Sequence, residues 1–161
     1  MIEQDTIKLL RECDAGVKMG ITSIDDVLEY VDSNDLEQLL SDCKKEHDRI
    51  DAEIQELLDK YEDEGKEPAA IAKGMSWMKT NMKLAMNESD HTIADLITDG
   101  CNMGVKSLNK YLNKYAAADE VSKDIARRKL IPAHIVQAHD EGAIHWHDMD
   151  CVKCFQETQV A

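Results

Sequence analysis

The chain has 161 residues, of which 43% are hydrophobic, so it can bury a sizeable core and is not disordered by composition. Its net charge is −14, and residues 1–64 carry 20 Asp and Glu against 7 Lys and Arg, which makes nucleic acid and anionic membranes poor partners. We find no apolar run long enough to span a membrane and no signal peptide, and five scattered cysteines favour reduced thiols, so we expect a cytoplasmic protein.

Two long amphipathic helices are predicted first, over residues 3–31 and 35–62. Between them, Ser33 or Asn34 can cap the start of the second helix. Along that helix, core-type side chains recur in steps of three and four, a spacing typical of helical bundles. These positions are Leu36, Leu39, Leu40, Cys43, His47, Ile50, Ile54, Leu57 and Tyr61.

The second half of the chain is also predicted to be helical. A short connector helix is expected over residues 69–86, after Pro68, followed by helices over residues 91–115 and from Ala118 to just before Pro132. We therefore predict an all-α protein. An antiparallel four-helix bundle with the connector occupies residues 1–130, and an irregular tail occupies residues 131–161.

An internal repeat relates the first long helix to the helix over residues 91–115. The stretches that begin at Gly16 and Gly100 share the pattern G-x-x-M-G-[IV]-x-S-[IL], at a constant offset of 84 residues. Two glycines four residues apart lie on one helix face, where another backbone can approach closely. We interpret Gly16, Gly20, Gly100 and Gly104 as packing residues at which the two helices cross. Chance similarity of two helices is the alternative.

The stretches HDRIDAEIQELLDKY and GCNMGVKSL resemble the small ferritin-like bundle proteins of anaerobic bacteria, and the similarity covers about residues 3–130. The resemblance implies a ferritin-like fold that often pairs into dimers, without a known reaction. We therefore expect a homodimer without catalytic residues. Di-iron enzymes of this fold use two Glu-x-x-His motifs. Here Glu88-x-x-His91 occurs once, at a helix start, where helix capping is the alternative.

A second resemblance begins near residue 120. The stretch EVSKDIARRKLIPAHIVQAHDEGAIHWHDMD is similar to the start of the catalytic domain of anaerobic ribonucleotide reductase, with an H-x-H-D-x-D signature at His145, His147, Asp148 and Asp150. That enzyme needs a large barrel and a glycyl radical, which we do not identify before Ala161. The resemblance implies a reductase-related tail, from a fusion or a truncated frame, that we expect to be inactive alone.

We assign no cofactor from the sequence. Two sets of side chains could nevertheless bind iron or zinc. His145, His147, Cys151 and Cys154 follow the spacing H-x-H-x₃-C-x₂-C, which offers four donors for tetrahedral zinc. The second set is Cys43, Glu46 and His47. For His47 the alternative is a satisfied core histidine beside a buried thiol. Three functions stay open: a non-catalytic ferritin-like module, a reductase-related chain that is inactive alone, and a bundle that stores or senses a metal ion.

Overall fold

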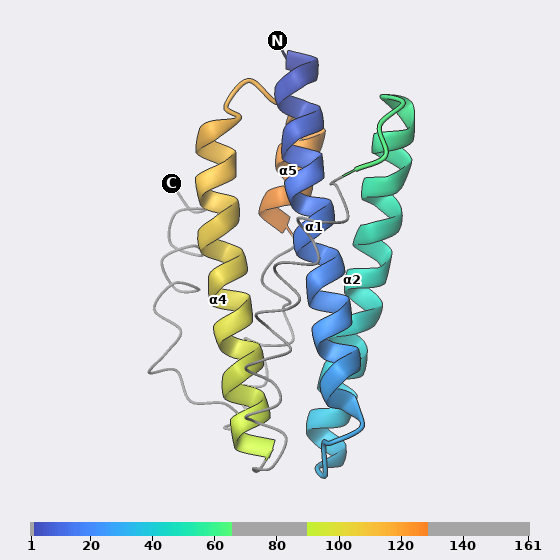
Figure 1. Ribbon diagram of the computed structural model, residues 1–161, viewed down its shortest axis with the longest axis vertical. Coiled ribbons are helices and arrows are strands. Elements are labelled where there is room, and N and C mark those ends of the chain that lie inside the picture. The colour runs from blue at the N-terminus through green and yellow to red at the C-terminus, as the bar shows by residue number, and fades with distance from the viewer. Residues whose placement is uncertain (1, 66–89, 129–161) are drawn as a thin grey trace.

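The computed structural model describes residues 2–65 and 90–128. They form four helices, α1 (Ile2–Leu28), α2 (Asn34–Lys60), α4 (Asp90–Lys114) and α5 (Glu120–Arg128), and no strand (Figure 1). The all-α prediction is confirmed for these residues, and each predicted helix end that falls within them lies within about three residues of the observed one. The predicted connector helix and the tail over residues 131–161 lie outside the described residues.

The ends of α2 follow the capping chemistry of its flanking residues. Ser33 adopts an extended backbone and its Oγ accepts a hydrogen bond from Leu36 N at 3.4 Å, as predicted for an N-cap. After Lys60, the backbone enters the left-handed region at Glu62 (φ 52°) and again at Gly65 (φ 82°). A glycine tolerates that conformation without steric cost, and α2 ends at this turn.

Hydrogen bonds at the two ends of the bundle fix the direction of α4. At one end, Asp90 accepts hydrogen bonds from Asp32 N at 2.9 Å and Ser33 N at 2.7 Å, so α4 begins beside the α1–α2 turn. At the other end, the turn after α4 bonds to the first turns of α1, where Ala117 N donates to Asp5 Oδ2 at 3.3 Å. Therefore α4 runs parallel to α2 and antiparallel to α1, and the end of α2 and the start of α4 lie at opposite ends of the bundle (Figure 1).

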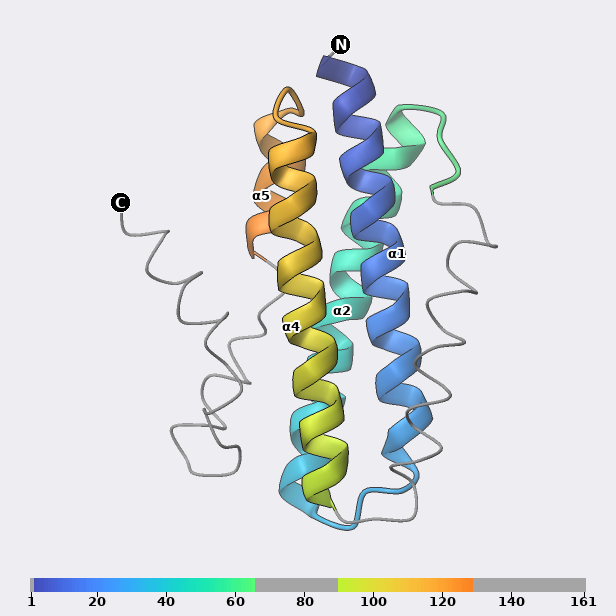
Figure 2. The same ribbon diagram turned by 60° about the vertical axis from the view of Figure 1, so that its left-hand side comes forward.

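Helix α1 is the central element, because it contacts α2, α4 and α5, and α5 also contacts α4 (Figure 2). The buried side chains form two clusters. The larger lies toward the start of α1 and contains Leu9, Leu10, Cys13, Val17, Ile50, Ile54, Leu58, Leu108, Tyr115, Ala118, Ile125 and Ala126. The smaller lies toward the α1–α2 turn and contains Ile24, Val27, Leu40, Cys43 and Ile93. In the described residues, no helix is both long and apolar enough to cross a membrane.

Candidate functional site

His47 is a buried polar residue on α2 between the two core clusters, with 7% of its surface exposed. Its Nδ1 lies 2.8 Å from the carbonyl oxygen of Cys43 and 3.6 Å from the Cys43 Sγ. Because a carbonyl oxygen can only accept, Nδ1 carries the proton and donates it to this oxygen. The imidazole is therefore anchored to its own helix, one turn back. This geometry is that of a satisfied core histidine beside a buried thiol, and metal binding by His47 stays a prediction.

The other edge of the imidazole contacts α1 at Gly20. A Cβ atom at Gly20 would lie 2.8 Å from His47 Cδ2 and 2.9 Å from His47 Nε2, whereas a Cβ at Gly16 would meet nothing within 4 Å. The predicted close approach thus exists at Gly20, but the neighbour is a side chain of α2 instead of a glycine of the second repeat copy. The face of α1 that carries Gly20 turns toward α2 at this point, and the crossing of the two glycine-bearing helices stays a prediction. For Gly100 and Gly104 the packing role stays a prediction.

Three cysteines of the described part are free thiols, Cys13, Cys43 and Cys101. Burial, with a smaller contribution from the nearby Glu46 charge, raises the pKa of Cys43 to about 11. Burial raises the pKa of Cys101, on α4, to about 12, and the nearby Cys43 of α2 makes a smaller contribution in the same direction. At neutral pH, without a bound metal ion, both thiols are protonated and are therefore poor nucleophiles.

The predicted metal set on α2 is only partly assembled. Cys43 and His47 lie together, but the Glu46 carboxylate pairs with Arg49 Nη2 at 2.7 Å. In residues 2–65 and 90–128, no group of three or more His, Cys, Asp or Glu side chains could hold a metal ion. His91, from the single Glu-x-x-His motif, is exposed and lies 3.1 Å from Asp95 on its own helix. Glu88 lies outside the described residues.

Asp14 is a fully buried carboxylate that our sequence analysis did not single out. Its Oδ1 accepts from Lys18 Nζ at 2.6 Å and from Gln55 Nε2 at 2.6 Å. A Cβ at Gly65 would approach Asp14 Oδ2 to 2.7 Å, so this glycine lets the turn after α2 lie against the carboxylate. A buried charge that is paired and hydrogen-bonded in this way joins α1 to α2, and its oxygens are engaged in structural contacts.

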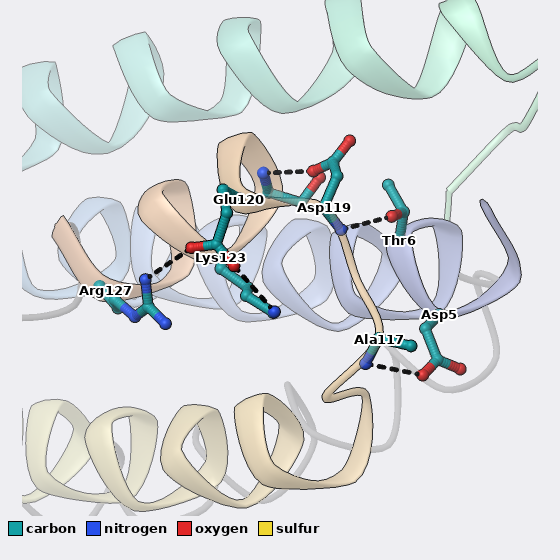
Figure 3. A network of polar contacts seen from close by, with 8 residues as sticks. Asp5, Thr6, Ala117, Asp119, Glu120, Lys123 and Arg127 are labelled. Atoms are coloured by element: carbon teal, nitrogen blue, oxygen red, sulfur yellow. Dashed lines mark hydrogen bonds and ion pairs between the residues drawn. The ribbon is translucent and has the colours of Figure 1, made fainter. Parts of the chain in front are cut away.

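Asp119 organises the junction of α4, α5 and the start of α1 (Figure 3). Its Oδ1 accepts from Ser122 N at 2.7 Å, which caps α5, and its backbone N donates to Thr6 Oγ1 at 2.8 Å. Tyr61 OH, at the end of α2, donates to Asp119 Oδ2 at 3.2 Å. On the outer face of α5, Arg127 pairs with Glu120 at 3.3 Å. The contacts of Asp119 tie three helices together at one end of the bundle.

Part of the chain is similar in sequence to an enzyme family. The family model of anaerobic ribonucleoside-triphosphate reductase matches residues 99–159. The anaerobic ribonucleoside-triphosphate reductase of Escherichia coli (strain K12) is 36% identical over 61 residues, which are 38% of this chain and 8% of that enzyme. The chain therefore corresponds to a small fraction of the length of this relative. No solved structure matches.

The match confirms the predicted reductase-like segment and widens it. We expected the similarity over about residues 120–150, and it begins at residue 99, inside α4. The described part of the matched segment contributes Val105, Leu108, Tyr115 and Ile125 to the buried core. The candidate zinc ligands His145, His147, Cys151 and Cys154 belong to the matched segment but lie outside the described residues, so zinc binding there stays a prediction.

Proposed function

We propose that this chain is a non-catalytic helical module whose C-terminal third is related to anaerobic ribonucleoside-triphosphate reductase. The similarity over residues 99–159 is the observation that carries the relationship. Residues 99–128 of this segment supply buried side chains of the bundle, so the reductase-like sequence is continuous with the helical core. The domain boundary that we predicted near residue 130 falls within the matched segment.

The polar groups of the described part support a structural role for the bundle. Asp14 is neutralised by Lys18, His47 donates to the backbone of its own helix, and Asp119 caps α5. A catalytic acid, base or nucleophile needs a group that is free to reach a substrate. These three buried or half-buried groups are engaged in contacts that hold helices in place.

An activity assay tests the proposal. The full chain, purified anaerobically, is incubated with a ribonucleoside triphosphate, a reductant and the activating partner of an anaerobic reductase. The E. coli enzyme serves as the positive control. We expect no deoxyribonucleotide above background, because the proposed role is structural. Turnover that increases with the amount of chain would overturn the non-catalytic assignment and favour a reductase activity.

We further propose that the bundle has a ferritin-like topology. Such bundles contain one long crossover connection between antiparallel helix pairs. The parallel course of α2 and α4 supports this topology, because the end of α2 and the start of α4 lie at opposite ends of the bundle. An experimental structure with α2 and α4 antiparallel would exclude the proposal.

We also propose that the chain forms a homodimer. Sedimentation of the full chain tests this, and a mass that stays at 18.2 kDa over a wide concentration range would contradict it.

We propose, in addition, that the chain binds iron or zinc. Metal analysis of anaerobically purified protein tests whether either ion is bound. The absence of bound iron and zinc, together with an unchanged melting temperature after adding either ion, would contradict metal binding.

A further inference from the structure

No further inference is drawn: the strongest candidate, the small apolar cleft between α2 and α4 lined by Leu36, Leu39, Cys43 and Ile97, carries none because nothing in the part of the chain that the structure describes shows what covers it.

Discussion

Gly16 and Gly20 lie one turn apart on α1 and share a sequence motif, yet their surroundings differ. Gly20 faces the ring of His47, which is held in place by its hydrogen bond to the Cys43 carbonyl. Gly16 has open space where a side chain would begin. Glycine inside a helix costs about 1 kcal/mol relative to alanine. That cost has a packing reason at Gly20, whereas no neighbouring atom in the described part of the chain explains it at Gly16.

Alanine substitutions should therefore have opposite effects at the two glycines. Gly16→Ala is expected to stabilise the protein by about 0.5–1 kcal/mol, because it removes the helix cost without a clash. Gly20→Ala gains the same helix propensity, but its Cβ overlaps the imidazole, and overpacking costs about 1–3 kcal/mol. We expect Gly20→Ala to be less stable than Gly16→Ala by about 1–3 kcal/mol in chemical denaturation. Equal stabilisation by both substitutions would contradict the observed contact.

A double-substitution cycle isolates the contact itself. His47→Ala alone should destabilise the core, because it leaves a cavity between the two clusters. In a His47→Ala background the clash at Gly20 disappears, so Gly20→Ala should become neutral or stabilising. Additive effects of the two substitutions would show that Gly20 and His47 do not interact.

The buried thiols should be nearly inert in the folded protein. Burial raises the pKa of Cys13 to about 12 and that of Cys43 to about 11, from an ordinary value of 9.0. Since alkylation requires the thiolate, ionisation alone slows Cys43 by about a hundredfold, and steric protection adds to this. Iodoacetamide labelling at pH 8, mapped by mass spectrometry, measures the rate at each cysteine. Denatured protein is the control, and Cys43 labelling at the denatured rate would contradict the prediction.

At the scale of the helices, Asp90 joins two connections that are distant in the sequence. Its carboxylate accepts hydrogen bonds from the backbone N–H groups of Asp32 and Ser33. Asp90 also lies in the first turn of α4, where a negative charge interacts favourably with the helix dipole. The start of α4 is thereby held against the α1–α2 turn. Val31, in the same turn, packs against the apolar cluster that contains Ile93 of α4, so Asp90 adds polar contacts to an apolar one.

Asp90→Ala should loosen this end of the bundle. It leaves two backbone N–H groups without their acceptor at a solvent-accessible site, and we expect a loss of about 1–2 kcal/mol in unfolding free energy. Hydrogen exchange at the amides of Asp32 and Ser33 should accelerate, while exchange near Asp119, at the opposite end, should not change. Unaltered protection of both amides would show that the turn is held by other contacts. Asp90→Asn, which keeps one acceptor oxygen, should be intermediate.

The helices themselves could be predicted from the sequence, because an amphipathic stripe depends only on local periodicity. The cap at Ser33 could also be predicted, because capping depends on the residue type at the start of the helix. The neighbour of Gly20 could not be predicted, since it depends on how α1 is rotated against α2. Asp14 could not be distinguished from the other acidic residues of the first two helices. Its burial depends on Gln55, 41 residues away, and on the turn at Gly65.

At the scale of the whole molecule, acidic pH should lower the free energy of unfolding, because it protonates carboxylates such as Asp63 and Asp119 that form contacts between distant parts of the chain. The bidentate contact with Arg11, at 2.8 and 2.7 Å, holds the pKa of Asp63 below its ordinary value, and Gly65 N contributes although partial burial opposes the shift. Partial burial would raise the pKa of Asp119, but the hydrogen bonds from Ser122 and Tyr61 outweigh it and the net direction is downward. Both carboxylates therefore favour the folded state when they are ionised.

The sign of this effect gives the expected pH dependence. A lowered folded-state pKa contributes stability that is complete above the unfolded-state pKa, near 4, and is lost as pH falls through the folded-state value. The unfolding free energy should thus be level above about pH 5 and fall below about pH 4. Asp63→Asn should lower stability at neutral pH and reduce the acid slope. An acid slope identical to that of the unsubstituted protein would exclude Asp63 as a contributor.

The bonds of Ala117 and Asp119 to Asp5 and Thr6 join backbone positions 112 and 113 residues apart. During synthesis on the ribosome, the hairpin of α1 and α2 can assemble as soon as its own residues have emerged. The first turns of α1, by contrast, acquire these partners only after Ala117 and Asp119 have been translated. Contacts of such long sequence separation are slow to form, and nascent α1 therefore acquires its neighbours on α4 and α5 late.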